Sequence, residues 1–280
     1  MDLRLLVAWL ALGAHVLVGC QSEVTHRSAA PNPSGSSQAV TAAAPSVTPT
    51  IVSSHGPEPV NEAEVIVKTI EQAMRAGLQG HDLRAYMSLW ADDATLVVAR
   101  RETKGRYDLS LTRAQIEASR KVRFSVPPVT NFAIEFADAD VKVEGDQATM
   151  TWLVATDVGG VDAKIAERYE LRKTATGWQV TLNRYWPVQH SRQGETMRYD
   201  IASWKRLDDA VAVAKQAGNG RKVLVALIAA WRFAEAHAQA KKVTAQPDVT
   251  AADWQTRSAM AVQVGDGKDA AAARAKAVQP

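Results

Sequence analysis

Two charged residues, Glu167 and Arg184, interrupt strand-like segments whose alternate positions are otherwise apolar. A buried charge without a partner costs several kcal/mol, so each residue requires a counter-ion or a polar ligand. The shortest closure of the loop at 174–177 places Glu167 opposite Arg184. The pattern therefore predicts an ion pair, which we interpret as a structural salt bridge near an open rim, with a ligand site as the alternative.

Aromatic residues surround this pair and define the candidate pocket. A Gly159-Gly160 turn places Trp152 beside Glu167 on the neighbouring strand. Large pockets for small molecules are mostly apolar and aromatic with few polar groups. The candidate pocket residues are Trp90, Trp152, Glu167, Tyr169, Arg184 and Trp186. A basic set could also form a rim attractive to anions, although we favour a solvated surface for it: Arg100, Arg101, Lys104, Arg106, Arg120, Lys121 and Arg123.

The strands that must position these residues are specified between 132 and 186. Apolar residues alternate on even positions up to Phe136 and on odd positions from Ala139, which indicates one inserted residue and a β-bulge. Turns at Gly145-Asp146, Gly159-Gly160 and Thr174–Gly177 join four strands into an antiparallel meander. The hairpins predict three rows of cross-strand partners: Val143, Ala148, Leu171 and Val180; Val141, Met150, Tyr169 and Leu182; Ala139, Trp152, Glu167 and Arg184.

Helices precede the meander. Asn61 and Glu64 form the pattern of a capping box before an amphipathic helix that ends near Gly80. Asp82 caps a second short helix, which is followed by a strand at 95–99. A third helix runs from about Thr112, where Gln115 completes another capping box, to about 124. The predicted fold class is α+β, with helices packed as a cone on a curved antiparallel sheet.

The phrases Gly80-His81-Asp82-Leu83, Leu89-Trp90-Ala91-Asp92-Asp93-Ala94-Thr95-Leu96 and Gly177-Trp178-Gln179-Val180 resemble the SnoaL-like, nuclear-transport-factor-like (cystatin-like cone) superfamily over residues 61–188. This resemblance implies a cone whose mouth can hold a ligand. In the similar ketosteroid isomerases the general base matches Val98 and the oxyanion-hole tyrosine falls near Met74, and neither side chain can do that chemistry. His81, in the turn between helices, is interpreted as solvated or capping. We therefore assign no catalytic residue, metal ligand or cofactor.

The N-terminus carries a different signal. Arg4 precedes an apolar run at 5–18 that ends in Leu17-Val18-Gly19-Cys20, which resembles the lipobox of bacterial lipoproteins. Cys20 is the only cysteine, so lipidation uses the sole thiol and leaves no disulfide. In enterobacterial lipoproteins an aspartate directly after the cysteine resembles an inner-membrane retention signal. Gln21 stands there instead, which favours the outer membrane, facing the periplasm, if the source is Gram-negative. An ordinary secretory peptide with a chance cysteine is the alternative.

The composition divides the rest of the chain. Residues 1–19 are the expected signal peptide, 20–60 a lipidated cysteine and Ser/Thr/Ala/Pro-rich tether, 61–188 the cone and 189–280 a helical module. The helical part is expected to contain five helices, at about 200–214, 221–230, 233–244, 251–264 and 268–278. Phe233 to Pro247 and Gly265 to Pro280 weakly resemble two tetratricopeptide-like units, and an irregular bundle explains their alanines as well.

Charge and composition restrict the function classes. The formal net charge of +3 comes from the last ninety or so residues, with 14 basic and 9 acidic side chains after 188, and we interpret this surplus as a solvated helical surface. No nucleic-acid partner is predicted. We expect a lipid-anchored envelope protein with a non-catalytic binding or scaffolding role, an envelope protein partner and a homodimer through the sheet as an option. The alternative is a small-molecule binder or an isomerase-, dehydratase- or cyclase-like enzyme. An unpaired carboxylate of raised pKa in the cone would reverse this preference.

Overall fold

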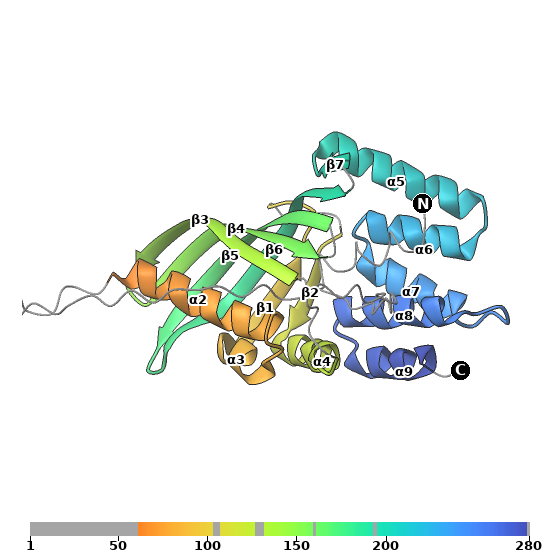
Figure 1. Cartoon of the computed structure of the whole chain (residues 1–280). Coiled ribbons are helices and arrows are strands. Elements are labelled where there is room, and N and C mark those ends of the chain that lie inside the picture. Colours follow the sequence, from red (N-terminus) through yellow and green to blue (C-terminus); the bar gives the residue numbers. More distant parts are fainter. Residues whose placement is uncertain (1–60, 103–106, 127–131, 159–160, 193–194, 279–280) are drawn as a thin grey trace, which may run out of the picture. The chain divides into compact units, whose positions relative to one another are not determined.

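A computed structural model describes residues 61–280 except 103–106, 127–131, 159–160, 193–194 and 279–280 (Figure 1). The predicted signal peptide, Cys20 and the tether lie outside the described residues. The first half of the described chain contains α2 (Glu62–Leu78), α3 (Leu83–Ser88), β1 (Trp90–Val98), β2 (Leu109–Thr112), α4 (Arg113–Phe124) and β3 (Phe132–Glu144). The second half contains β4 (Gln147–Val158), β5 (Val161–Thr174), β6 (Gly177–Arg192), β7 (Glu195–Arg198), α5 (Ile201–Gln216), α6 (Gly220–Ala229), α7 (Phe233–Val243), α8 (Ala251–Gln263) and α9 (Gly267–Ala277).

Two of the three predicted helix caps are confirmed. The Asp82 side chain accepts a hydrogen bond from the Ala85 N–H at 2.9 Å, and Thr112 forms a full capping box with Gln115. The capping box at Asn61 is wrong, because its side chain makes no cap hydrogen bond and Glu64 instead pairs with Lys68, one turn further along α2. The helix forms nonetheless, since Ile66, Ile70, Met74 and Leu78 bury one face against the sheet.

The sheet has seven strands in the order β2-β1-β6-β5-β4-β3, with β7 also paired to β6. The α+β class is confirmed, with one correction: β1 pairs with β6 in parallel, so the sheet is mixed. The sequence did not predict β2 or β7. Both are four-residue strands, too short for alternation to reveal. Figure 1 shows α2 lying across the sheet that β3 to β6 form.

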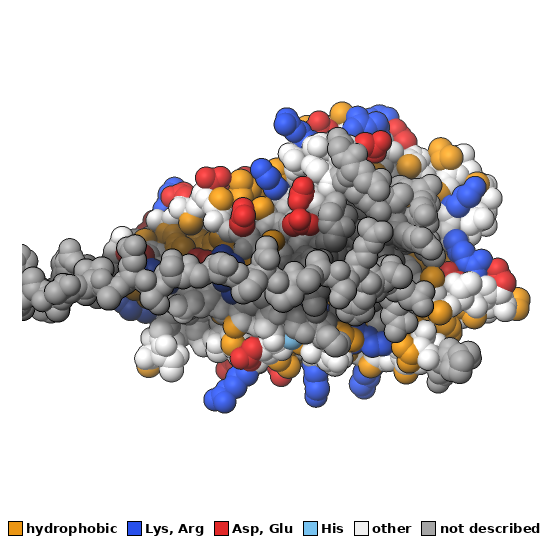
Figure 2. Space-filling view, viewed as in Figure 1, with side chains coloured by type: hydrophobic (Ala, Val, Ile, Leu, Met, Phe, Trp, Pro, Cys, Tyr) orange, Lys and Arg blue, Asp and Glu red, His pale blue; other side chains and the backbone are white. Residues whose placement is uncertain are grey.

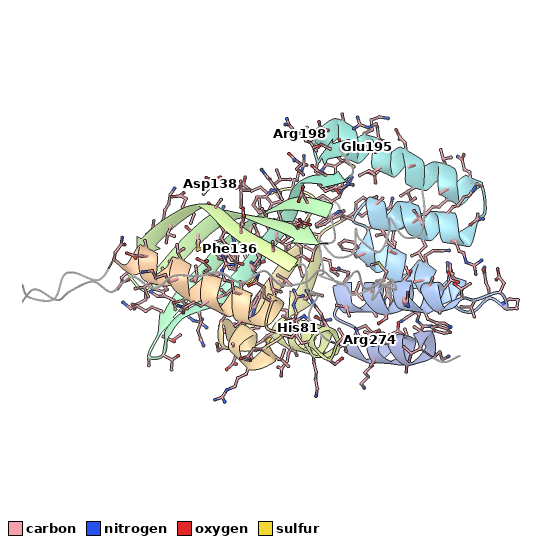
Figure 3. All side chains as sticks on the ribbon, viewed as in Figure 1. His81, Phe136, Asp138, Glu195, Arg198 and Arg274 are labelled. Carbon is pink, nitrogen blue, oxygen red and sulfur yellow. The ribbon has the colours of Figure 1, made fainter. Side chains whose placement is uncertain are left out.

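The first two predicted hairpins are confirmed. Val141 pairs with Met150, and Met150 with Tyr169, while Trp152 lies opposite Glu167. The predicted bulge is present between Ala137 and Asp140, so Ala139 does not pair with Trp152 as the third row required. Asp138 adopts φ 54° within this bulge and is exposed, and Figure 3 shows it on β3. The change of apolar phase in the sequence therefore located a real bend in the strand.

The predicted register of the third hairpin is wrong beyond its first row. Leu171 pairs with Val180, but Glu170 then pairs with Leu182, so Thr181 is an extra residue in β6. Its hydroxyl donates to the Glu170 carbonyl at 3.1 Å. This second bulge shifts the partners from Leu182 to Pro187 by one residue, and in a strand a shift of one residue exchanges the two faces. Glu167 consequently lies opposite Tyr185, and Arg184 lies opposite Arg168.

The five predicted helices of the C-terminal part are confirmed, and their interior is continuous with that of the cone. One cluster of buried side chains extends from Ile66 on α2 to Met260 on α8. Tyr185 on β6 packs edge-on against Trp231, with ring centroids 6.3 Å apart. The expected division at 188 and 189 falls inside β6, which runs to Arg192. The cone (residues 61–188) and the helical tail (residues 189–280) thus share one core.

Two further features concern the surfaces of this unit. The helices in the described ranges are too short or too polar for any of them to cross a bilayer. Figure 2 shows basic and acidic side chains interspersed on the face in view.

The Arg274 guanidinium of α9 donates to the Val122 carbonyl and to the Ser125 hydroxyl at 2.9 Å, which joins α9 to α4 (Figure 3).

Candidate ligand-binding cavity

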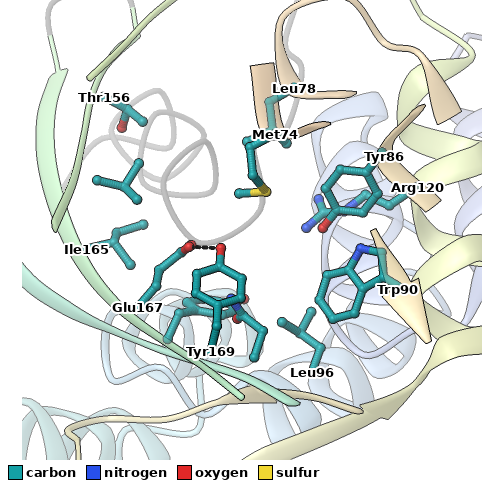
Figure 4. Close-up of a pocket in the computed structure, with 13 residues that line it drawn as sticks. Met74, Leu78, Tyr86, Trp90, Leu96, Arg120, Thr156, Ile165, Glu167 and Tyr169 are labelled. Carbon is teal, nitrogen blue, oxygen red and sulfur yellow. Dashed lines mark hydrogen bonds between the residues drawn. The ribbon is translucent and has the colours of Figure 1, made fainter. Parts of the chain in front are cut away.

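A small cavity lies inside the cone, between α2, α3 and α4 on one side and the concave face of the sheet on the other (Figure 4). Its volume is about 40 Å³, counted as the space open to the centres of water molecules. A single water centre needs about 10–15 Å³ of such space, so the cavity has room for roughly three waters or a small organic molecule. Its walls are Met74, Leu78, Tyr86, Trp90, Leu96, Arg120, Val154, Thr156, Ile165, Glu167, Tyr169, Asn183 and Tyr185.

Glu167 is the acidic residue of this cavity, and only 8% of it is exposed. Its Oε2 accepts hydrogen bonds from the Trp152 indole N–H at 3.0 Å and from the Tyr169 hydroxyl. Burial raises the pKa of Glu167, and the hydrogen bonds from Tyr169, Trp152 and Asn183 and the positive charge of Arg120 only partly oppose this. Glu167 therefore holds its proton more tightly than an exposed glutamate does.

Four other residues of the cavity wall have buried polar atoms without a hydrogen-bond partner among the described residues. These atoms are the Trp90 Nε1, the Arg120 Nε, the Thr156 Oγ1 and the Asn183 Oδ1. Buried polar atoms in folded proteins are nearly always paired, because an unpaired one costs about 1–3 kcal/mol. Donors and acceptors that belong to the wall of one cavity and lack protein partners are typical of a site that holds water or a ligand.

The wall opposite Glu167 is basic. Figure 4 shows Glu167 and Tyr169 on one side and Arg120, Tyr86 and Trp90 on the other. The Arg120 guanidinium carbon lies 5.2 Å from the centre of the Tyr86 ring. One turn further along α4, Arg123 is 5% exposed, and its Nε and Nη1 are buried without a partner among the described residues. α4 thus places one guanidinium group, that of Arg120, in the cavity wall and buries a second, that of Arg123, one turn away.

The structure divides the six residues predicted for the pocket into three groups. Trp90, Glu167 and Tyr169 line the cavity, and Trp152 contacts it through its hydrogen bond to Glu167. Arg184 and Trp186 lie on the other face of β6, because the bulge at Thr181 exchanges the two faces. The predicted ion pair between Glu167 and Arg184 is therefore wrong. Arg184 instead pairs with Asp108 at 2.8 Å.

The same bulge explains which cavity residues the sequence did not reveal. Asn183 and Tyr185 take the inward positions that had been assigned to Leu182 and Arg184, and they pair with Tyr169 and Glu167. Asn183 stands between Leu182 and Arg184, so its sequence neighbours gave no signal of an inward position. Arg120 and Arg123 were predicted only as part of a basic rim, whereas Arg101 and Lys121 of that set are exposed and Arg100 pairs with Asp208 of α5 at 3.0 Å. Lys104 and Arg106 lie outside the described residues.

The remaining residues considered for catalysis have structural roles. Val98 is buried, and Met74 contributes an apolar side chain to the cavity wall. His81 stacks on Phe124 with ring centroids 5.0 Å apart, and its Nδ1 lies 2.7 Å from the Val126 carbonyl oxygen. This contact attaches the turn after α2 to the end of α4.

A second cluster of ionisable side chains lies in the helical tail. His237, Asp266 and Asp269 have potential metal-ligand atoms within 4.8 Å of one another. Asp269 already accepts hydrogen bonds from His237 Nε2 at 2.8 Å and from the Arg257 guanidinium, and Lys241 lies 3.6 Å from Asp266. Cations of the protein therefore occupy the positions around these carboxylates. We interpret the cluster as a network that joins α7, α8 and α9.

The fold is an α+β cone with a helical tail, and the comparisons with known proteins concern the cone. No family model and no curated protein matches the chain. Among solved structures, the chain is similar to an NTF2-like protein from Pseudomonas putida, with 19% identity, a TM-score of 0.36, and coverage of 44% of this chain and 84% of that one. It is similar to a candidate dehydratase of the NTF2-like family from Streptomyces avermitilis, with 19% identity, a TM-score of 0.37, and coverage of 47% and 99%. A candidate ketosteroid isomerase from Parabacteroides distasonis has 18% identity, a TM-score of 0.36, and coverage of 46% and 89%.

Proposed function

We propose that the cone binds a small organic molecule, which presents a hydrogen-bonding group to Glu167. The observation that carries the proposal is the set of unpaired polar atoms around the cavity, on Trp90, Arg120, Thr156 and Asn183. A carboxyl group of raised pKa in an apolar cavity is a further mark of a functional site. These features favour the small-molecule interpretation over the purely scaffolding role that the sequence had favoured.

The test uses butyramide, a neutral molecule of about six non-hydrogen atoms, which matches a volume of roughly three waters. We expect millimolar butyramide to raise the melting temperature of the wild-type protein, and Glu167→Met to abolish that rise. Glu170→Met is the matched control, because Glu170 is exposed and faces away from the cavity three residues further along β5. No stabilisation of the wild type, or equal stabilisation of Glu167→Met, would contradict the proposal.

Glu167 also favours a second function, proton transfer to or from the bound molecule. A general acid or base works best with a pKa near the working pH, and burial moves the pKa of Glu167 in that direction. The matching reaction removes a proton from the carbon beside a carbonyl group. Ionised Glu167 takes the proton, the electron pair of the C–H bond moves to the carbonyl oxygen to form an enolate, and Glu167 then returns a proton exchanged with solvent to the carbon. Butanone in heavy water is a suitable probe. Proton NMR should show enzyme-dependent deuterium exchange that Glu167→Gln abolishes, and exchange at the buffer rate would exclude this function.

We further propose that the mature chain is attached to the bacterial cell envelope through lipid on Cys20. The support is the Leu17-Val18-Gly19-Cys20 sequence after an apolar run, with no other thiol in the chain. Cys20→Ser should move the protein from the membrane fraction to the soluble fraction without changing its melting temperature. Continued membrane retention would contradict the anchor. An outer-membrane location, an envelope protein partner and a homodimer through the sheet stay predictions.

A further inference from the structure

The charges around the cavity do not balance. Arg120 lines it, and Arg123 lies close enough to Tyr185 of its wall for the two side chains to interact electrostatically. The facing ionisable groups are Glu167 and the hydroxyls of Tyr86, Tyr169 and Tyr185. Burial raises the pKa of both Tyr169 and Tyr185, so these residues are neutral at ordinary pH.

This imbalance persists in both protonation states of Glu167. An arginine side chain remains protonated in proteins, even where burial lowers its pKa as at Arg123. If Glu167 is ionised, it compensates one of the two guanidinium groups, and if it is protonated, it compensates neither. Among the described residues no other carboxylate faces them. The interior of the cone therefore carries at least one surplus positive charge.

Such a surplus is costly in a dry interior. The unpaired Nε of Arg120 and the unpaired Nε and Nη1 of Arg123 are donors that water does not reach. Removing one partner of a buried ion pair destabilises a protein strongly, because the remaining charge is left uncompensated. A cone that folds with two such groups is arranged for an anion that arrives from outside the chain.

We infer that the ligand of this cavity is a small monocarboxylate, whose carboxylate is bound by Arg120 and further stabilised by the charge of Arg123. The inference rests on the ligand-binding function proposed above and names the class of ligand. A carboxylate carries a negative charge that reduces this surplus, and guanidinium groups bind carboxylates with strong, directional hydrogen bonds. The cavity volume of about 40 Å³ restricts the rest of the molecule to a short chain. A hydrogen-bonding group at the far end of that chain faces Glu167, which lines the same cavity.

The test compares butyrate with butyramide, which have the same size and differ in charge. Titration calorimetry at constant ionic strength should show that wild-type protein binds butyrate roughly tenfold or more tightly than butyramide, as expected for a charge-assisted hydrogen bond. Arg120→Met should remove this preference. Lys121→Met is the matched control, because it removes the same charge from an exposed position on the same helix.

The Arg123→Met variant provides an independent test, in which the melting temperature and the affinity for butyrate should change in opposite directions. In the ligand-free protein, Arg123→Met should raise the melting temperature, because it removes an uncompensated buried charge. The same variant should bind butyrate more weakly than the wild type does. A purely structural role for Arg123 predicts the reverse, a lower melting temperature with unchanged butyrate affinity.

The outcomes separate this inference from the function on which it rests. If butyramide binds in a Glu167-dependent way and butyrate binds no more tightly, the anion inference is overturned and the ligand-binding function stands. If neither compound binds, both are overturned. Butyrate binding that Arg120→Met leaves unchanged places the anion elsewhere and overturns the inference.

Discussion

Buried charges in the helical tail have partners within the protein, whereas two buried guanidinium groups in the cone have donor atoms without one among the described residues. In the tail, Asp269 is surrounded by His237 and Arg257, and the 4% exposed side chain of Asp253 pairs with Arg221 at 2.9 Å. In the cone, Arg120 and Arg123 have unpaired donor atoms, and Glu167 is the carboxyl group that shares the cavity with Arg120.

This difference indicates where a binding site lies in a chain with few recognisable motifs. A charge network that the protein completes by itself holds helices together, and its loss is a loss of stability. A network that the protein leaves incomplete indicates a missing partner. Four experiments test this contrast, from the largest expected effect to the smallest.

The largest effect is expected from cutting the chain after Gln189. The fragment loses the buried Trp204 and Trp231, which belong to the same core as the sheet, and exposes the side of Tyr185 that packs on Trp231. We expect it to aggregate or to melt without a cooperative transition, as measured by gel filtration and circular dichroism. A monomeric fragment with a sharp transition would show that cone and tail are separate domains, and the contrast would then concern two independent cores.

Asp269→Asn should destabilise the protein by about 2–3 kcal/mol at pH 7. Burial alone would raise the pKa of Asp269, but hydrogen bonds from Arg257 and His237 outweigh it and lower the pKa from 3.8 to about 2. Because the folded pKa is depressed, this stabilisation is present above pH 3.8 and is lost as the pH falls towards 2. Urea unfolding at pH 7 and at pH 2.5 should therefore show a smaller difference at the lower pH.

Asp209→Asn is the control for that measurement. Its ion pair with Lys205 is exposed, so its removal should cost under about 0.5 kcal/mol. An equally large loss at Asp209 would mean that the buried network in the tail has no special weight.

Arg184→Met tests the face of β6. Arg184 and Asp108 are 16% and 10% exposed, and breaking their pair should cost about 1–3 kcal/mol in urea unfolding. Affinity for butyrate should stay within about twofold of the wild type, because Arg184 lies outside the cavity. A marked loss of affinity would return Arg184 to the ligand site and contradict the observed register.

The smallest effect is a pH dependence at Glu167. Its pKa is raised above 4.5 in the folded state, chiefly by burial, so folding is favoured while Glu167 is protonated. This contribution is fully present below pH 4.5 and is lost as the pH rises through the folded pKa. The stability of Glu167→Gln relative to the wild type should therefore increase between pH 4.5 and pH 7.5. An unchanged difference would show that Glu167 is ionised throughout this range.

Much of the fold was predictable because local patterns determine it. The change of phase after Phe136 located the bulge in β3, and the glycine turns fixed two hairpin registers. The short strands β2 and β7 and the parallel pairing of β1 with β6 were not predictable, since they depend on contacts between segments far apart in the chain.

The candidate site was half predictable for a similar reason. Glu167 was identified because a charge at an apolar position needs a partner, and that argument holds in any register. Its partners were misassigned because Thr181 has no sequence mark that distinguishes a bulged residue from a paired one. Arg120 and Arg123 lie on a helix rich in basic residues, and only the packing of α4 separates the buried guanidinium groups from the exposed Lys121.

The bulge at Thr181 determines which residues of β6 point into the cone. Inward and outward residues alternate along a strand, and the extra residue at Thr181 exchanges the two faces from Leu182 to Pro187, before a second irregularity in the register. Deleting Thr181 should restore the register without a bulge. Arg184 would then point towards Glu167, and Asn183 and Tyr185 would leave the cavity. When β6 is aligned with a related strand, a gap misplaced by one position therefore transfers every site residue after Thr181 to the wrong face of the sheet.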